Sequence, residues 1–142
     1  YQKNNRTIKH IVSKNYGIQF SVRSLHVNDN KFYFTLEIEN SSNVAYTIEW
    51  VNFKIVDKKN LKRTVVQDKL LEPIRVYFPT MTASDHSKIL GIYLLNQFTL
   101  LKDQVFEIEI LEKNGGRHQK VQLENKDLIH ARLINSLNIK TK

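Results

Sequence analysis

The chain has 142 residues, of which 41% are hydrophobic and 25% are charged, and it contains no cysteine. This length and composition favour one soluble domain with one core, and they exclude a disulfide framework and a cysteine zinc site. No apolar run approaches the roughly 20 residues of a membrane-spanning helix, while the formal net charge of +8 would attract nucleic acid, anionic lipid or an acidic protein surface.

Residues 1–14 are polar and basic, and they predict a lead-in segment, or a strand that needs a partner, ahead of a single domain over residues 15–142. The domain opens with an expected strand over residues 17–27. Its apolar residues change parity near Arg23 and Ser24, as they do at a β-bulge. Further predicted strands, bounded by turn residues, cover residues 32–39, 46–56, 63–67, 74–78, 88–95, 107–112 and 119–123.

Burial is predicted from the alternation of side chains within these strands. Trp50, the only tryptophan, is the expected core anchor of its aromatic strand. Four glutamates alternate with apolar residues and are therefore expected to face solvent; they are Glu37, Glu39, Glu107 and Glu109. Two prolines, Pro73 and Pro79, should mark the limits of one short strand, because neither can donate a hydrogen bond to a sheet.

The most informative segment is Glu107–His118, which predicts a strand, a tight glycine turn and the start of a second strand. The Asn-Gly-Gly run at residues 114–116 should supply the positive φ angles that a primed hairpin turn needs. Such a turn would bring three side chains to one exposed tip, where a neighbouring subunit or an acidic partner could bind them: Lys113, Arg117 and His118.

The C-terminal part has a different periodicity. Ile129, Leu133 and Leu137 recur every four residues, which predicts a short helix with Asn125 as its N-cap. The eight or so strands before it do not alternate with helices. The sequence therefore predicts an all-β fold, an antiparallel β-sandwich of immunoglobulin-like or related type with a short C-terminal helix.

No motif predicts catalysis, a cofactor or a metal site. None of the five histidines has a second histidine or a carboxylate at metal-ligand spacing. Asp85 and His86 lie between Ser84 and Ser87, but neighbours in sequence seldom orient one another as a catalytic triad. The glycine pair at residues 115–116 precedes a strand and lacks the lysine and hydroxyl of a phosphate loop. We therefore expect a protein that is not an enzyme and has no small-molecule substrate.

Basic residues gather at both ends of the chain and around the turn that follows residue 57. This third cluster consists of Lys54, Lys58, Lys59, Lys62 and Arg63. Within it, Lys62 and Arg63 are candidate protein-binding residues, in addition to the three at the hairpin tip. The same positive charge leaves open a second interpretation, in which a basic surface binds DNA.

Several short segments match a known family in order along almost the whole chain. They are residues 6–10, 32–34, 38–43, 46–49, 57–59, 62–64, 67, 97–100, 112–118 and 125–127. On these segments the chain resembles the C-terminal domain of TraN, a conjugative transposon protein of Bacteroidetes. The hairpin motif at residues 112–118 (Glu-Lys-Asn-Gly-Gly-Arg-His) is the most specific of them. The family tends to have a Pro-Tyr step where this chain has Ala45-Tyr46.

The resemblance implies a non-enzymatic component of a conjugative type IV secretion system, similar to the β-rich outer-membrane core subunit of VirB-type systems. It implies a periplasmic location at the outer membrane, assembly into rings, and two partners: a small lipoprotein and a subunit that spans the envelope. The alternative is a DNA-binding accessory factor of conjugation. The chain begins at Tyr1 and its only methionine is Met81, so we expect a processed chain or an excised domain, with any signal peptide or anchor upstream.

Overall fold

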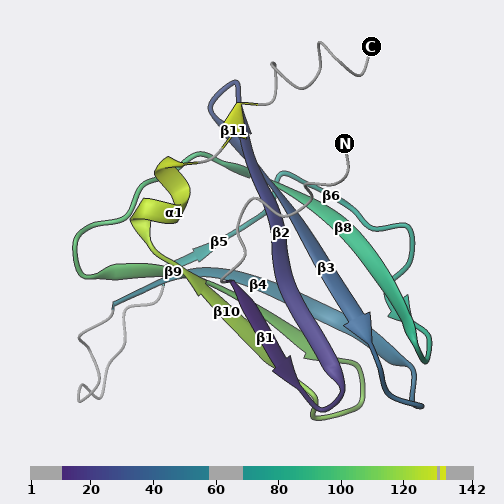
Figure 1. Ribbon diagram of the computed structural model, residues 1–142. Helices are drawn as coiled ribbons and strands as arrows, with labels where there is room; N and C mark the ends of the chain where they lie inside the picture. Colours follow the sequence, from purple (N-terminus) through teal and green to yellow (C-terminus); the bar gives the residue numbers. More distant parts are fainter. Residues whose placement is uncertain (1–10, 58–68, 131, 134–142) are drawn as a thin grey trace, which may run out of the picture.

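The computed structural model describes residues 11–57, 69–130 and 132–133. These residues form two mostly antiparallel β-sheets that pack face to face, with one short helix near the C-terminal end of the described part (Figure 1). The predicted all-β sandwich with a short C-terminal helix is confirmed.

The larger sheet has the strand order β1-β2-β3-β8-β6, and β11 pairs with β2 beside β1. Its strands are β1 (Val12–Asn15), β2 (Ile18–Asn28), β3 (Lys31–Asn40), β6 (Arg75–Tyr77), β8 (Ser87–Asn96) and β11 (Arg132–Leu133). All neighbours are antiparallel except β11, which runs parallel to β2.

The smaller sheet has the order β10-β9-β4-β5, and β7 pairs separately with β4. Its strands are β4 (Tyr46–Asp57), β5 (Lys69–Leu71), β7 (Thr82–Ala83), β9 (Gln104–Glu112) and β10 (Gln119–Leu123). Both β5 and β7 lie on the same edge of β4, opposite β9.

Alternating apolar side chains of the two sheets meet in the core. On β3, four side chains at every second position are buried: Phe32, Phe34, Leu36 and Ile38. Phe34 packs against Phe106 of β9 with ring centroids 5.3 Å apart, and Phe53 of β4 packs against Tyr93 of β8 at 5.0 Å. These aromatic contacts join one sheet to the other, so the core depends on residues far apart in the sequence.

Two β-bulges decide which way the side chains point. The register of β2 shifts between Val22 and Ser24, which confirms the bulge predicted there. A second shift, between Ile48 and Trp50 of β4, was not predicted. Because a bulge inserts one extra residue, it reverses the parity of the positions that follow. The prediction that Trp50 anchors the core is therefore wrong: this side chain is 60% exposed, while Phe53 takes a buried position.

The C-terminal helix is shorter than its predicted stripe and begins with a different cap. Helix α1 covers Asn125–Ile129, and Glu124 is its N-cap, in a capping box with Asp127. The predicted cap Asn125 is wrong, because its side-chain oxygen instead accepts a hydrogen bond from the Leu100 amide at 3.0 Å. Leu133 belongs to β11 and not to the helix, and Leu137 lies outside the described residues.

Part of the expected lead-in segment belongs to the sandwich. Residues 12–15 form β1, a strand that pairs with β2, and Ile11 is buried in the core. The first ten residues lie outside the described part, as does the strand predicted over residues 63–67.

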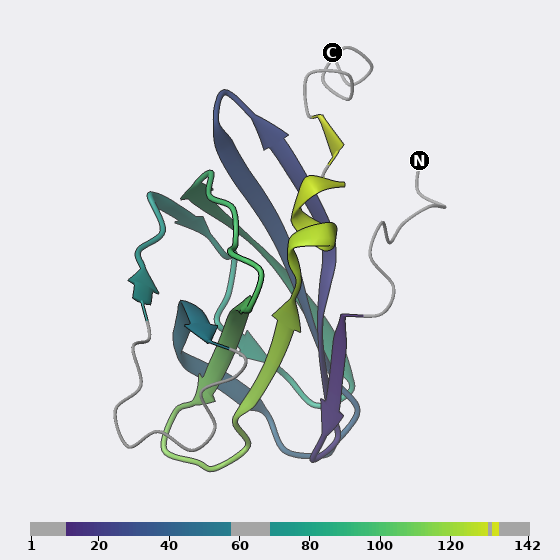
Figure 2. The same ribbon diagram turned by 90° about the vertical axis from the view of Figure 1, so that its left-hand side faces the viewer.

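One side of the sandwich is closed by a polar side chain. Strand β10 of the smaller sheet runs beside β1 of the larger sheet (Figure 2). Gln119 at the start of β10 donates to the carbonyl oxygens of Asn15 (3.1 Å) and Ile18 (3.0 Å) and accepts from the Ser13 hydroxyl (2.6 Å). A single buried amide thus joins the two sheets along this side.

Candidate functional site

The predicted hairpin tip is a longer connection than expected. Residues 113–118 join β9 to β10, and among them only Asn114 has a positive φ (55°). The prediction that Gly115 and Gly116 supply positive φ angles is wrong. Gly115 is required for space instead, because a Cβ atom there would collide with the carboxylate of Glu112.

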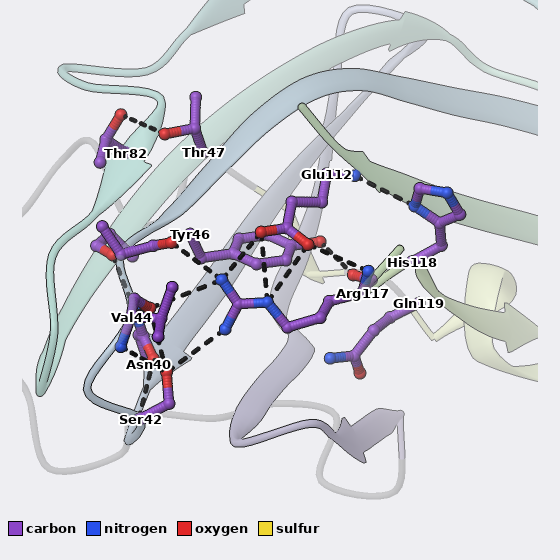
Figure 3. A network of polar contacts seen from close by, with 12 residues as sticks. Asn40, Ser42, Val44, Tyr46, Thr47, Thr82, Glu112, Arg117, His118 and Gln119 are labelled. Carbon is purple, nitrogen blue, oxygen red and sulfur yellow. Dashed lines mark hydrogen bonds and ion pairs between the residues drawn. The ribbon is translucent and has the colours of Figure 1, made fainter. Parts of the chain in front are cut away.

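Arg117 does not project from this tip. Its guanidinium forms a bidentate ion pair with Glu112, with 2.8 Å between Nη2 and Oε2, and its Nη2 also donates to the Ala45 carbonyl at 2.8 Å (Figure 3). Only 16% of the Arg117 side chain is exposed. Lys113 and His118 are exposed as predicted, although Nδ1 of His118 accepts a hydrogen bond from the Glu112 amide. Arg117 is therefore held against the sandwich and does not share the exposed tip with Lys113 and His118.

The Arg117 network continues into the turn between β3 and β4. Tyr46 donates its hydroxyl to the Arg117 carbonyl at 2.8 Å, and the guanidinium of Arg117 stands 5.2 Å from the centre of the Tyr46 ring. Arg117 also donates to the Ser42 hydroxyl at 3.3 Å. Asn40 extends the network by donating to the carbonyl oxygens of Val44 (2.8 Å) and Ala83 (3.0 Å).

The ionisation of this network follows from its contacts. The hydrogen bond from the Arg117 guanidinium is the main cause that lowers the pKa of Glu112 below its ordinary value. Burial, with the nearby Glu112 charge, raises the pKa of Tyr46, so that its hydroxyl stays protonated and can donate. The network thus holds the β9–β10 connection against the sandwich, so its role is to stabilise the fold. The other two candidate residues, Lys62 and Arg63, lie outside the described residues.

Two of the glutamates predicted to face solvent are buried. Glu37 and Glu107 are 5% and 6% exposed. Glu37 accepts from Arg23 at 2.6 Å and lies 3.4 Å from the ammonium of Lys88, and Glu107 lies 3.8 Å from that of Lys54. Long basic side chains can lie over a sheet and cover such carboxylates. Part of the positive charge of the chain is therefore paired internally.

A second surface feature is an apolar groove of about 400 Å³ along the edge of β4. Strand β7 pairs with β4 at Tyr46 and Thr47, and β5 pairs with it at Phe53 to Ile55. Between them no described strand pairs with residues 49–52 on this edge. We call these four residues and the groove beside them the β4 window.

Within the described residues, the path of the chain leaves the β4 window uncovered. After β5 the chain crosses to the larger sheet, where β6 pairs with β8, and then returns to the β4 edge as β7. The amide of Ile48 donates to the Met81 carbonyl at 2.8 Å, at the point where the chain returns. Pro73 and Pro79 bracket the excursion, and proline cannot donate to a sheet. The limits that they predicted for the short strand agree with β6.

A close packing contact fixes this excursion against the core. The ring of Phe78 lies on the backbone of Gly91 in β8, so closely that a Cβ atom at Gly91 would be 2.5 Å from ring atoms. Phe78 also packs edge-on against Tyr93, with ring centroids 5.7 Å apart. Position 91 therefore has no room for a side chain beneath the Phe78 ring.

The lining of the β4 window combines exposed apolar side chains with unpaired carboxylates. Trp50, Leu70 and Val76 are 60%, 65% and 46% exposed, and all three line the groove. Glu49 and Glu72 line it as well, and neither has a hydrogen bond or an ion pair within the described part of the chain. An exposed apolar groove with a few polar groups at its rim is typical of a binding surface.

The sequence carries one local signal at the β4 window, the two prolines that limit β6. Prolines do not indicate that two distant segments leave a gap beside β4. Elsewhere, Asp85 and His86 form an exposed contact of 3.8 Å in a loop. No group of three or more histidine, aspartate or glutamate side chains among the described residues could hold a metal ion.

Within the described residues, no helix has both the length and the apolar character needed to cross a membrane. A comparison with models of protein families gives a match to a domain of unknown function (DUF4138) over residues 1–133. A search of curated proteins gives no match.

Proposed function

The chain belongs to the DUF4138 family, a domain of unknown function, and we propose that it is a non-enzymatic assembly domain of a conjugative transfer apparatus that binds other subunits of the envelope channel. The observation that carries this proposal is the β4 window. A strand edge without a partner, beside an exposed apolar groove, is a surface that another protein can cover.

The exposed side chains of the β4 window favour a protein partner. Burying a fully exposed leucine or valine side chain contributes about 1.5–3 kcal/mol, and covering Leu70 and Val76, which are 65% and 46% exposed, would contribute part of that. Tryptophan is enriched among the residues that dominate protein interfaces, and Trp50 is the largest exposed side chain of the groove. A partner that covers these residues would remove apolar area from water, which favours association.

The resemblance to the C-terminal domain of TraN supplies the biological setting of the proposal. On this resemblance, the domain would lie in the periplasm at the outer membrane, within a type IV secretion system. The partners would be a lipoprotein, an envelope-spanning subunit and further copies of this chain in a ring. The hairpin motif at residues 112–118, on which the resemblance mainly rests, is the segment that Arg117 fastens to the sandwich.

The proposal is tested by affinity recovery of the full chain from cells that carry the intact transfer apparatus, at about 50 mM and about 200 mM salt. We expect envelope subunits to be recovered at both concentrations, and Trp50→Ala to lower their recovery at least tenfold. Leu101→Ala is the matched control, since Leu101 is 71% exposed but lies outside the groove. It should leave recovery unchanged.

The alternative of a DNA-binding accessory factor gives a different result in the same experiment. Phosphate contacts make DNA binding fall steeply as salt rises, so DNA would be recovered at the lower concentration and lost at the higher one. Recovery of DNA with no envelope protein, and with no effect of Trp50→Ala, contradicts the proposed assembly function.

A further inference from the structure

The β4 window also indicates what kind of segment it receives. We propose that it binds an extended peptide strand of a partner protein, in which apolar side chains alternate with polar ones and lysine or arginine flanks the apolar run. This inference rests on the proposed function, because it specifies the partner that the same surface recognises.

The geometry of the groove favours a strand over other shapes. Five consecutive residues of β4 line it, from Glu49 to Phe53. Successive side chains of a strand point to opposite faces of the sheet, so a groove that touches all five must run along the edge of the strand. At an edge, main-chain donors and acceptors are available, and an added strand can pair with them.

The neighbours of the β4 window set the length of the added strand. The pairing of β7 with β4 ends at Thr47, and the pairing of β5 with β4 starts at Phe53. The Met81 carbonyl accepts a hydrogen bond from the Ile48 amide. Four residues remain, which is roughly 13 Å of strand at about 3.3 Å per residue. Both neighbours run antiparallel to β4, so an incoming strand of the same direction would continue their line.

The floor and walls of the groove select alternate apolar side chains. Tyr93 and Phe53 are buried beneath it, and Leu71 and Met81 are partly buried against the core. A strand lying along the β4 edge would turn every second side chain toward this apolar floor and the others toward Trp50 and solvent.

The acidic side chains of the groove favour basic residues at the two ends of the peptide. In a chain with a formal net charge of +8, the charged side chains that line this groove among the described residues are both acidic, Glu49 and Glu72. Neither makes an ion pair within the described residues. By contrast, Glu37, Glu107 and Glu112 are all paired with basic side chains of the chain itself. Unpaired carboxylates at the rim of an apolar groove complement a cationic partner.

Two synthetic peptides test this inference with the whole chain. The first is acetyl-Lys-Val-Thr-Val-Lys-amide, whose short apolar run matches the four-residue gap on the β4 edge, and the matched control replaces both lysines by glutamate. Trp50 is the only tryptophan of the chain and lines the groove, so its fluorescence reports binding directly. We expect saturable binding of the lysine peptide with a blue shift of the emission, and at least tenfold weaker binding of the glutamate peptide.

Two variants locate the contact. Glu49→Gln combined with Glu72→Gln should abolish the preference for the lysine peptide while leaving the fold intact, since both side chains are exposed. N-methylation is made at the central threonine in one peptide and at the valine after it in another, because amides of successive strand residues point to opposite edges and only one set faces β4. One of the two N-methylated peptides should bind at least tenfold more weakly, because it loses a main-chain donor to β4. Equal binding of both charged peptides, or no loss on N-methylation, overturns the inference.

The outcomes separate this inference from the proposed function. If the lysine peptide binds at the window but no envelope subunit is recovered from cells, the inference stands and the proposed function fails. If Trp50→Ala reduces subunit recovery but neither peptide binds, the function stands and the inference fails. Sedimentation of the chain alone gives a further outcome. Self-association that Trp50→Ala abolishes would show that a second copy covers the groove, which also overturns the inference.

Discussion

Tyr46 and Arg117 are joined by two separate contacts, although 71 positions separate them in the chain. The Tyr46 hydroxyl donates to the Arg117 carbonyl at 2.8 Å, and the Arg117 guanidinium stands 5.2 Å from the centre of the Tyr46 ring. Because the same guanidinium also pairs with Glu112, the start of β4 and the end of β9 are held together by one side chain.

Arg117→Ala should destabilise the fold by about 2 kcal/mol, because it leaves the Glu112 carboxylate, only 12% exposed, without its cation. Arg117→Lys should recover less than half of this loss, since an ammonium cannot form a bidentate pair. Urea unfolding measures both. Lys113→Ala, at an exposed neighbouring position, is the control and should change the free energy of unfolding by less than about 0.5 kcal/mol. An Arg117→Ala loss no larger than that of the control contradicts this account.

The stability that Glu112 contributes should depend on pH. Its pKa in the folded protein lies below the ordinary value of 4.5, mainly because of the Arg117 hydrogen bond. The unfolded chain therefore takes up a proton first as pH falls, so the contribution is complete above 4.5 and is lost as pH falls through the folded pKa. The difference in unfolding free energy between the wild type and Glu112→Gln should accordingly shrink below 4.5. In an Arg117→Ala background, the same comparison should show a much smaller pH dependence.

Gly91→Ala should destabilise the protein by about 1–3 kcal/mol, because the added methyl group would meet the Phe78 ring at 2.5 Å. Phe78→Ala in the same chain should relieve part of the clash, so the double variant should lose less than the sum of the single losses. A double-mutant cycle from urea unfolding measures this coupling. Additive losses would mean that the two residues do not interact.

Trp50→Ala should change the free energy of unfolding by less than about 0.5 kcal/mol, because the indole is 60% exposed and, among the described residues, its Nε1 donates only to Asn52 of the same strand. Phe53→Ala, three residues later on the buried face, should cost about 3–5 kcal/mol. Thermal unfolding of the two variants side by side distinguishes these positions. A large loss of stability for Trp50→Ala would contradict the exposed position and indicate that this side chain is buried in the core.

Asn40→Asp should destabilise the fold by about 2 kcal/mol despite its nearly unchanged shape. The amide nitrogen of Asn40 donates to the carbonyl oxygens of Val44 and Ala83, and a carboxylate would place an acceptor against both. Ser41→Ala is a suitable control at the next, exposed position. Urea unfolding measures both variants, and a loss in Asn40→Asp no larger than that in Ser41→Ala would contradict this account.

Local patterns in the sequence were sufficient to predict the fold class and most of the strands. The alternation of Phe32, Phe34, Leu36 and Ile38 has the period of a half-buried strand, and the change of parity near Arg23 indicates a bulge. These signals succeed because a strand's period of two and its turn residues are properties of neighbouring positions.

The side-chain positions that depend on contacts with distant segments were decided by the tertiary structure alone. Whether Trp50 points into the core depends on a bulge in β4 that forms against β9, and whether Arg117 projects depends on Glu112, Tyr46 and the Ala45 carbonyl. The β4 window is defined by where β5 ends and where β7 begins. A strand's period tells which side chains share a face, but burial and edge pairing follow from segments that only folding brings together.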